Sequence, residues 1–179
     1  MDHVQTVVVG SGVVGIAIAR KLAVEGHDVL VLEAEDSGFH HTSARNSQVM
    51  HAGMFCDPGS LKARFCVKGQ RMLYDFCETR HVDHIRCGKL IIAANEEQLT
   101  TLKSLQNRGA ENGVHELRLL TAQDAVVLEP ELRCVGALLS PSTGTLDAPS
   151  FMRAMQGEAE ARGAMFAYKA PLLAAQKMG

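Results

Sequence analysis

A short apolar run leads directly into a glycine-rich turn near the start of the chain, and this junction constrains the fold more than any other feature. The run is Val7-Val8-Val9, and the turn is Gly10-Ser11-Gly12-Val13-Val14-Gly15. In such a turn the first glycine permits a tight bend, the second lets the backbone approach a pyrophosphate, and the third lets a helix pack closely on the strand. Because a helix N-terminus favours an anion, Gly10, Gly12 and Gly15 predict a dinucleotide site.

The residues after the turn predict the rest of a β-α-β unit over residues 4–33. A helix from Val13 to Glu25 carries Ala17, Ile18 and Leu22 on one face, and Gly26 is positioned to cap it. A second apolar strand then ends at Glu33, close to the spacing expected for an acid that accepts hydrogen bonds from ribose hydroxyls. A carboxylate there would repel a 2′-phosphate, which disfavours NADP. The turn alone does not separate NAD from FAD.

A long polar segment, residues 37–59, follows this unit. An ordinary NAD-binding domain would return soon after Glu33 to a helix and a parallel strand, so the segment argues against a simple NAD-dependent dehydrogenase. A loop of this length inside a compact fold usually carries function.

The remainder of the chain predicts alternating helices and strands. Ser60 is expected to cap a helix that runs to about Arg80, and Thr121 with Asp124 resembles a capping box for a short helix before Pro130. The buried side of the first of these helices is predicted to be Leu61, Phe65, Met72, Leu73 and Phe76. The other predicted elements are strands at 88–94, 137–140 and 165–169, a helix at 96–112 with Leu99, Leu102 and Leu105 inward, and a helix at 150–162. Residues 1–59 and 146–179 are therefore assigned to a nucleotide-binding portion, and residues 60–145 to a second region.

Composition excludes several classes of function. The chain has 179 residues, of which 46% are hydrophobic, and a net charge of −2, which gives no basic field for nucleic acid. No apolar run is long enough to span a membrane, and no export signal is visible. The five cysteines are odd in number and form no CxxC pair, so reduced thiols in a cytoplasmic protein are expected, with a peripheral position at the inner membrane as the alternative.

Several motifs together resemble a known family. They are the glycine-rich turn, Thr42-Ser43-Ala44-Arg45-Asn46-Ser47 with His51-Ala52-Gly53, Pro58-Gly59-Ser60-Leu61-Lys62-Ala63, Cys87-Gly88-Lys89-Leu90-Ile91-Ile92-Ala93, Leu128-Glu129-Pro130, and Ser140-Pro141-Ser142-Thr143-Gly144-Thr145-Leu146-Asp147. In this order they resemble the FAD-dependent oxidoreductases of the D-amino-acid oxidase superfamily, and within it the L-2-hydroxyglutarate dehydrogenase/oxidase branch. Gln48 and Cys56 depart from the pattern, in which a small or acidic residue and an aromatic residue are more common.

The resemblance implies an α/β fold: an FAD/NAD(P)-binding Rossmann-like βαβ fold with an inserted partial α+β substrate region, truncated. It implies FAD as cofactor and oxidation of a 2-hydroxy acid such as L-2-hydroxyglutarate by hydride transfer to the flavin. The electron acceptor, oxygen or a quinone, is left open. His51 is the implied catalytic residue, near the flavin ring. The implied FAD contacts are Gly10, Gly12, Val13, Val14, Gly15, Glu33, Ala34, Thr42, Ser43, Asn46, Ser47 and Gln48.

Other readings remain beside this one. The chain can be a non-catalytic dinucleotide-binding module, or an FAD-dependent amino-acid or amine oxidase. Cys77, His81, His84 and Cys87 are zinc-ligand types, but their spacing matches no zinc finger, so no metal site is predicted. The basic helix face formed by Lys62, Arg64, Lys68 and Arg71 is interpreted as solvated surface. A partial sheet would expose an unpaired edge, which predicts self-association.

Overall fold

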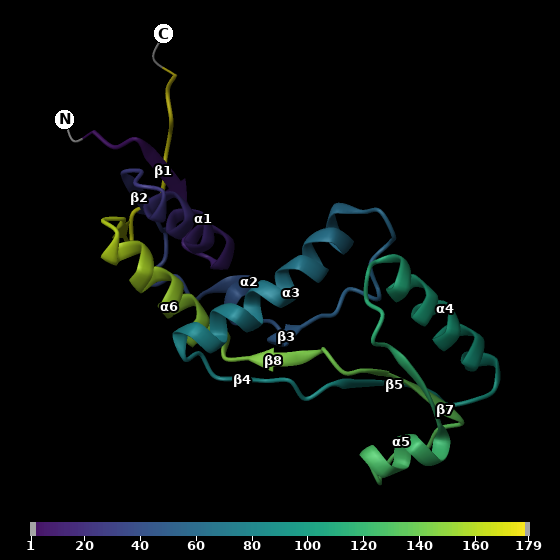
Figure 1. The fold of residues 1–179 in the computed structure, drawn as a ribbon. Helices are drawn as coiled ribbons and strands as arrows, with labels where there is room; N and C mark the ends of the chain where they lie inside the picture. Colours follow the sequence, from purple (N-terminus) through teal and green to yellow (C-terminus); the bar gives the residue numbers. More distant parts are fainter. Residues whose placement is uncertain (1–2, 178–179) are drawn as a thin grey trace. The chain divides into compact units, whose positions relative to one another are not determined.

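The structure is a computed structural model that describes residues 3–177, and it contains two compact units. The first unit runs up to Ser47 and resumes at Asp147, and the second extends from Gln48 to Leu146 (Figure 1). The second unit therefore begins at Gln48, whereas the sequence reading began its second region at residue 60.

The first unit has the predicted β-α-β start, extended by one helix and one strand from the end of the chain. Its parallel three-stranded sheet has the order β1-β2-β9, in which Val8 pairs with Val31 and Val31 with Phe166. The predicted Rossmann-like α/β arrangement is confirmed. The elements are β1 (Thr6–Val9), α1 (Val13–Val24), β2 (Val29–Leu32), α2 (His41–Ala44), α6 (Ala148–Ala161) and β9 (Met165–Ala167).

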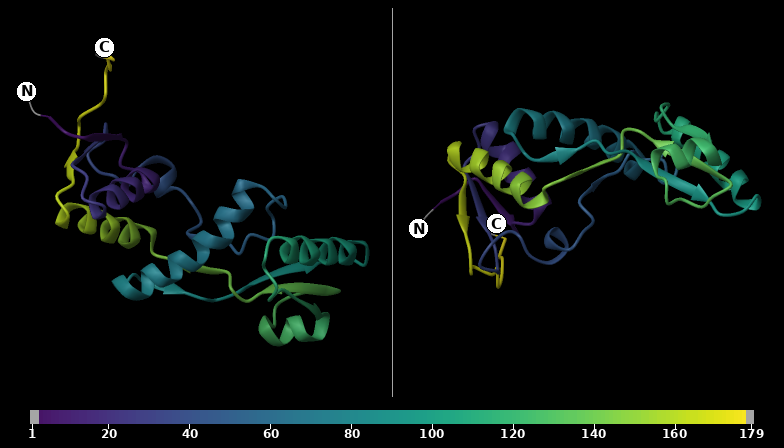
Figure 2. Two further views of the ribbon diagram at one scale, coloured as in Figure 1. Left: turned by 45° about the horizontal axis from the view of Figure 1, so that its top comes forward. Right: turned by 90° about the horizontal axis from the view of Figure 1, so that it is seen from below.

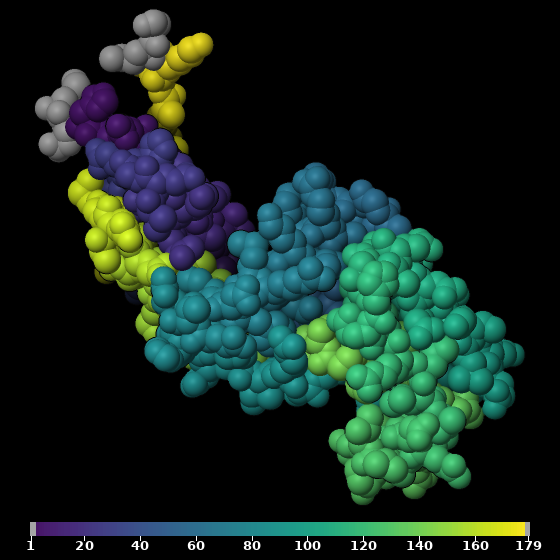
Figure 3. Space-filling view, in the orientation of Figure 1, coloured from purple at the N-terminus to yellow at the C-terminus, as the bar shows by residue number. Residues whose placement is uncertain are grey.

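Helices α1 and α6 lie side by side in the first unit, and small residues let them approach closely (Figure 2). In the space-filling view, the yellow-green surface of α6 lies against the purple and blue surface of the N-terminal residues (Figure 3). Arg20 on α1 and Glu158 on α6 form an ion pair beside this contact. The buried cluster consists of Val8, Ala19, Ala23, Val29, Val31, Ala159 and Ala164.

The buried side of α1 differs from the apolar face expected from the sequence. Ile16, Ala19 and Ala23 are buried, whereas Ala17 and Ile18 are exposed. The face of α1 that packs against the sheet and α6 carries Ala19 and Ala23 with the larger Ile16, adjacent to the face that the apolar pattern favours. Ala17, Ile18 and Leu22, which the sequence predicted to face inward, line an open hollow in the first unit.

The second unit contains two antiparallel three-stranded sheets, with strand orders β3-β8-β4 and β5-β7-β6. Helix α4 packs on the sheet β5-β7-β6 (Figure 1). The core there consists of Ala52, Met54, Ala93, Leu102, Val114, Leu117 and Leu138. The elements are β3 (Val49–Met50), α3 (Leu61–Arg80), β4 (His84–Ile85), β5 (Lys89–Ala93), α4 (Glu97–Glu111), β6 (Arg118–Thr121), α5 (Ala122–Leu128), β7 (Gly136–Ser140) and β8 (Gly144–Leu146).

Local capping signals set the helix ends as the sequence predicts. The Ser60 hydroxyl accepts a hydrogen bond from the Ala63 amide at 3.1 Å, and α3 begins at the next residue, Leu61. Thr121 and Asp124 form the predicted capping box of α5. Helix α6 starts at Ala148 rather than at residue 150, because Pro149 occupies its first turn, where proline is favourable.

The prediction for the buried side of α3 is wrong at three positions. Leu61, Phe65 and Met72 are exposed, and Leu73 and Phe76 are only half-buried. The helix turns a more polar side to the interior, because two of its polar side chains satisfy backbone carbonyls there. Gln70 donates to the Met50 and Ser142 carbonyls at 3.1 and 3.0 Å, and Tyr74 donates to Ser142 at 2.9 Å. The buried residues of this side are Ala63, Gln70, Tyr74 and Cys77.

Candidate functional site

The glycine-rich turn lies between β1 and α1, and two of its glycines are required by the geometry. Gly10 has a φ of +94°, a conformation that residues with a side chain rarely adopt. At Gly15 a Cβ atom would lie 1.9 Å from the carbonyl oxygen of Gly10. Only glycine at this position lets the helix start so close to the end of the strand.

The segment that contains α2 reaches back to the turn through Ser43. Its hydroxyl accepts a hydrogen bond from the Val13 amide at 3.1 Å, and a Cβ at Gly12 would lie 3.3 Å from the same oxygen. A serine hydroxyl that accepts one hydrogen bond still has its own proton to donate. Ser43 therefore adds a donor to the amides at the N-terminus of α1.

The carboxylate of Glu33 is held at the end of β2 by three hydrogen bonds. Oε2 accepts from the Ser11 amide at 2.7 Å and from the Ser11 hydroxyl at 3.0 Å, and Oε1 accepts from the Glu35 amide at 3.0 Å. Burial raises the pKa of Glu33, but the hydrogen bonds from the Glu35 and Ser11 amides outweigh it, so the pKa is lower than usual. The group is ionised at neutral pH, and a carboxylate has about four acceptor positions, so it can still accept from a ligand hydroxyl.

The turn, Glu33 and Ser43 fit a dinucleotide such as FAD. Gly12 has no Cβ to fill the space beside Ser43, the N-terminus of α1 follows it directly, and Glu33 supplies an acceptor one strand away. The structure brings Gly10, Gly12, Val13, Val14, Gly15, Glu33, Ala34 and Ser43 together in the first unit.

The other predicted contacts in the first unit lie on the chain that follows. Asn46 donates to the carbonyls of Thr42 and Ser43 at 3.2 and 2.9 Å, which closes the short helix α2. Thr42 and Ser47 are exposed. Ahead of them, His40 and His41 lie beside Asp36 and Glu35, at 2.9 and 2.8 Å, so these adjacent histidines belong to ion pairs when protonated.

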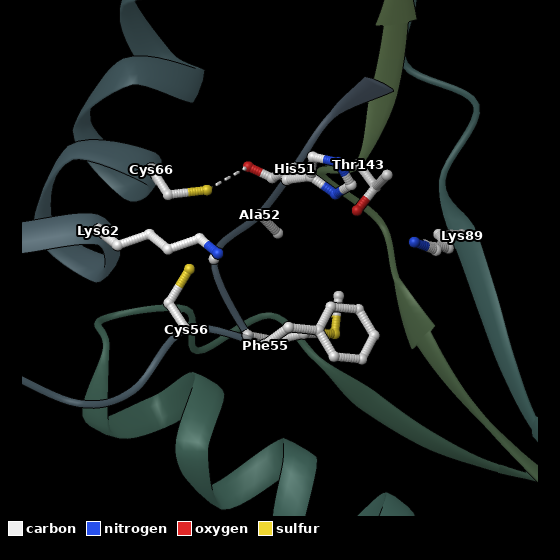
Figure 4. A pocket seen from close by; sticks show the side chains of 10 residues that line it. His51, Ala52, Phe55, Cys56, Lys62, Cys66, Lys89 and Thr143 are labelled. Atoms are coloured by element: carbon white, nitrogen blue, oxygen red, sulfur yellow. Dashed lines mark hydrogen bonds between the residues drawn. The ribbon is translucent and has the colours of Figure 1, made fainter. Parts of the chain in front are cut away.

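Gln48 and His51 belong to the second unit. Gln48 has a φ of 56°, in the left-handed region that residues with a side chain rarely adopt. His51 follows β3 and lines a cavity of about 190 Å³ (Figure 4). The other residues that line the cavity are Ala52, Gly53, Met54, Phe55, Cys56, Lys62, Cys66, Lys89 and Thr143.

The cavity lowers the pKa of the His51 imidazole. Although His51 is exposed as a whole residue, the partial burial of its imidazole is the largest cause of the lowered pKa, and the positive charges of Lys89 and Lys62 add to it. His51 is therefore neutral at pH 7 and can accept a proton. The backbone carbonyl of His51 accepts a weak hydrogen bond from the Cys66 thiol at 3.4 Å, which ties this residue to α3 (Figure 4).

Sequence reasoning missed the two lysines of the cavity. Lys62 is exposed, as its interpretation as part of a solvated basic face predicts, but it also lines the cavity with His51. Lys89, predicted only as a strand residue, lines the same cavity. The signal that could have found Lys62 is its place in the first turn of α3, directly after the polar loop that carries His51.

Among residues 3–177, no group of three or more His, Cys, Asp or Glu side chains is arranged to hold a metal ion. Cys77, one of the four residues of zinc-ligand type, is fully buried on α3. In the same part of the chain, every helix is too short or too polar to cross a lipid bilayer.

Comparison with known proteins agrees with this geometry. The family model of FAD dependent oxidoreductases matches residues 5–179. The chain is 42% identical over 190 residues to a mitochondrial L-2-hydroxyglutarate dehydrogenase of Arabidopsis thaliana, covering 96% of this chain and 39% of that protein. It is 40% identical over 144 residues to the Homo sapiens protein of the same name, covering 79% of this chain and 31% of that protein. The chain thus spans well under half the length of these relatives.

Solved structures share the fold. An L-α-glycerophosphate oxidase from Mycoplasma pneumoniae with FAD bound superposes with a TM-score of 0.89 at 24% identity, covering 94% of this chain and 45% of that chain. A glycine oxidase from Bacillus cereus superposes with a TM-score of 0.82 at 20% identity, covering 98% of this chain and 49% of that chain. With the family match over nearly the whole sequence, the turn, the acid after β2 and the loop that follows have one explanation: the chain belongs to the D-amino-acid oxidase family of FAD-dependent oxidoreductases.

Proposed function

We propose that this chain binds the ADP part of FAD on its first unit and forms part of an enzyme that oxidises a 2-hydroxy acid, with L-2-hydroxyglutarate as the substrate. The observation that carries the proposal is His51, a neutral imidazole in a cavity with two lysines. The identity of about 40% with L-2-hydroxyglutarate dehydrogenases supports the choice of substrate.

The cofactor would be held by residues of the first unit. The amides at the N-terminus of α1 and the Ser43 hydroxyl would donate to the pyrophosphate, and Glu33 would accept from ribose hydroxyls. Thr42, Asn46 and Ser47, with Gln48 of the second unit, are proposed to contact the rest of the cofactor.

His51 would act on the substrate hydroxyl. Bound FAD would supply the acceptor for the hydride that leaves the substrate carbon. The imidazole nitrogen takes the hydroxyl proton, so the carbon–oxygen single bond becomes a carbonyl and the substrate loses two electrons and two hydrogens in total. A lowered pKa keeps the imidazole unprotonated and ready for this step.

The test is a visible absorption spectrum of the purified chain after FAD is added and free flavin is removed, followed by anaerobic addition of L-2-hydroxyglutarate. The proposal expects retained flavin bands that bleach with this substrate. The variant His51→Asn should retain the bands and bleach at least about a hundredfold more slowly, in line with typical losses of a general base. His115→Asn, an exposed histidine of the same unit that does not line the cavity, is the matched control.

Other results would choose between the alternatives. Bands that persist with the hydroxy acid but bleach with an amino acid would support an amino-acid or amine oxidase. Flavin bands that persist with both the hydroxy acid and the amino acid would support a dinucleotide-binding module without catalytic turnover. A colourless protein that retains no FAD would overturn the proposal. Re-oxidation by oxygen, compared with a soluble quinone, identifies the electron acceptor.

For the cellular location we propose a reducing compartment, because Cys56, Cys66, Cys77, Cys87 and Cys134 are all free thiols. The cytoplasm is one such compartment, and the Arabidopsis and human relatives are named as mitochondrial. Fractionation of cells, with the chain detected by antibody, distinguishes the two.

A further inference from the structure

We propose that Lys62 and Lys89 bind the two carboxylates of a small dicarboxylate, one on each side of the cavity, with the oxidisable carbon near His51. This inference rests on the proposed function, because it names the residues that would select the substrate class of the same site.

The two lysines reach the cavity from different elements. Lys62 lies in the first turn of α3 and Lys89 is the first residue of β5. In Figure 4 they approach from opposite sides, with His51 and Thr143 between them at the top and Phe55 below. A ligand that lies across the cavity between them would present one anionic group to each lysine, which favours a dicarboxylate over a single phosphate.

The charges around the cavity are all of one sign. Its ionisable residues are one histidine, two cysteines and two lysines, and it is lined by no aspartate or glutamate. Within residues 3–177, no carboxylate lies within ion-pair distance of Lys62 or Lys89. The cavity therefore holds positive charge that a dianionic ligand would compensate.

Lys89 has a contact that keeps it at the edge of the cavity. Its ammonium nitrogen lies 5.3 Å from the centre of the Phe55 ring, within the range of a cation–π interaction. Such a contact limits the conformations of a flexible side chain without neutralising its charge. Lys89 is thus partly preorganised to bind an anion.

The size and lining of the cavity set limits on the ligand. Its volume of about 190 Å³ is smaller than the roughly 300–1,000 Å³ of pockets that hold drug-sized ligands. That is room for a small organic acid and too little for a nucleotide. Ala52, Met54 and Phe55 supply apolar surface for methylene groups between the carboxylates.

The same charges discriminate against amino acids. An α-amino acid brings an ammonium group to the carbon that is oxidised, and here that group would face two lysines that no acid of the cavity offsets. A hydroxyl at this carbon carries no charge and can donate its proton to His51. The cavity therefore favours a hydroxy-dicarboxylate over an amino acid.

The experiment measures binding to the whole chain without flavin, by isothermal titration calorimetry at low salt. The probes are 2-oxoglutarate and glutarate, which lack the oxidisable hydroxyl, with butyrate as the monocarboxylate. We expect both dicarboxylates to bind at least tenfold more tightly than butyrate. Lys62→Gln and Lys89→Gln should each weaken dicarboxylate binding about tenfold and leave butyrate within about threefold, since each loses one charged hydrogen bond.

Lys68→Gln is the matched control, because Lys68 is an exposed lysine of the same helix that does not line the cavity. It should change binding by less than about twofold, because exposed charges outside a site contribute little. Circular dichroism establishes that every variant is folded. Equal affinity for glutarate and butyrate, no binding of either dicarboxylate, or equal effects of Lys68→Gln and Lys62→Gln would overturn the inference.

The outcome separates this inference from the proposed function. If the chain binds dicarboxylates through the two lysines but retains no FAD, the inference is supported and the proposed function is contradicted. If L-2-hydroxyglutarate bleaches the flavin equally well in Lys62→Gln and Lys89→Gln, the proposed function is supported and the inference is contradicted.

Discussion

The side chain of Glu33 accepts two hydrogen bonds from Ser11, one from its amide at 2.7 Å and one from its hydroxyl at 3.0 Å. Glu33, at the end of β2, therefore has a structural role: its hydrogen bonds to Ser11 connect the glycine-rich turn to the neighbouring strand. Ser11 is fully buried, so these hydrogen bonds have no ready replacement from solvent.

Glu33→Gln is expected to destabilise the first unit by about 1–2 kcal/mol and to weaken FAD binding about tenfold. The amide that replaces the carboxylate has one acceptor oxygen, so it cannot serve both Ser11 and the Glu35 amide. Urea denaturation measures the first effect and FAD titration the second. Glu25→Gln removes an exposed carboxylate of the same unit and should change neither property appreciably.

The same carboxylate makes the stability of this unit depend on acid pH. The folded-state pKa of Glu33 is lower than its usual value, so the stabilisation is complete above the ordinary glutamate pKa of about 4.3. It is lost as the pH falls through the lower, folded-state pKa. The unfolding free energy, measured by denaturation at a series of pH values, should therefore fall below about pH 4. It should fall less in Glu33→Gln than in the unmodified chain. Equal drops in both proteins would assign the acid sensitivity to other groups.

Gly15→Ala is expected to unfold the first unit or destabilise it by at least about 3 kcal/mol, because its Cβ would lie 1.9 Å from the Gly10 carbonyl oxygen. Gly157→Ala is the matched control, since a Cβ on this exposed residue of α6 meets nothing within 4 Å. It should stabilise the helix by up to about 1 kcal/mol. Thermal denaturation of both variants provides the comparison, and a folded Gly15→Ala with normal stability would contradict the close approach of α1 to the turn.

Lys89→Gln is expected to raise the pKa of the His51 imidazole. Burial is the largest cause of its lowered pKa, and the charges of Lys89 and Lys62 come next, so removing one charge relieves only part of the shift. NMR titration of the imidazole resonances gives the pKa directly, with His51→Asn used to assign them. Lys103→Gln, on α4 and outside the cavity, should leave the value unchanged.

Gln70→Leu is expected to cost about 1–3 kcal/mol of unfolding free energy, because it removes donors from the carbonyls of Met50 and Ser142. Tyr74→Phe should cost only about 1 kcal/mol, since the Ser142 carbonyl keeps its hydrogen bond from Gln70. Chemical denaturation ranks the two variants against Arg71→Gln, an exposed neighbour on α3. A larger loss in Tyr74→Phe than in Gln70→Leu would reverse the ranking expected from these hydrogen bonds.

Self-association is proposed to occur through β1. Within residues 3–177 this strand pairs only with β2, and Val7 and Val9 on it are 45% and 60% exposed. Light scattering should show an average molecular mass that increases with protein concentration. In Val9→Lys this increase should be smaller, because a charge on an edge strand opposes its pairing with another strand. A mass that stays monomeric at all concentrations would contradict the proposal.

The elements that sequence could predict are those fixed by local chemistry. The turn at Gly10–Gly15 requires glycine whatever surrounds it, and the caps at Ser60 and Thr121 are formed by residues three positions apart. For this reason the β-α-β unit and the helix starts at Leu61 and Ala122 follow from the sequence.

The elements that sequence could not predict depend on distant partners. Phe65 and Met72 satisfy a helical apolar pattern, yet Gln70 and Tyr74 face inward, because the carbonyls of Met50 and Ser142 need donors. The cavity depends in the same way on the fold of the second unit, which brings Lys62 and Lys89 to His51. No spacing rule connects a residue of a helix with the first residue of a later strand.

The hydrogen bond from the Leu146 amide to the Gln48 carbonyl, at 3.1 Å, joins the first and last residues of the second unit. A segment whose two ends meet in this way can be inserted into a host domain, or removed from it, with only a short bridge needed to close the gap. Residues 48–146 can therefore be exchanged for another segment whose two ends lie equally close, with the parallel sheet and α1 of the first unit unchanged.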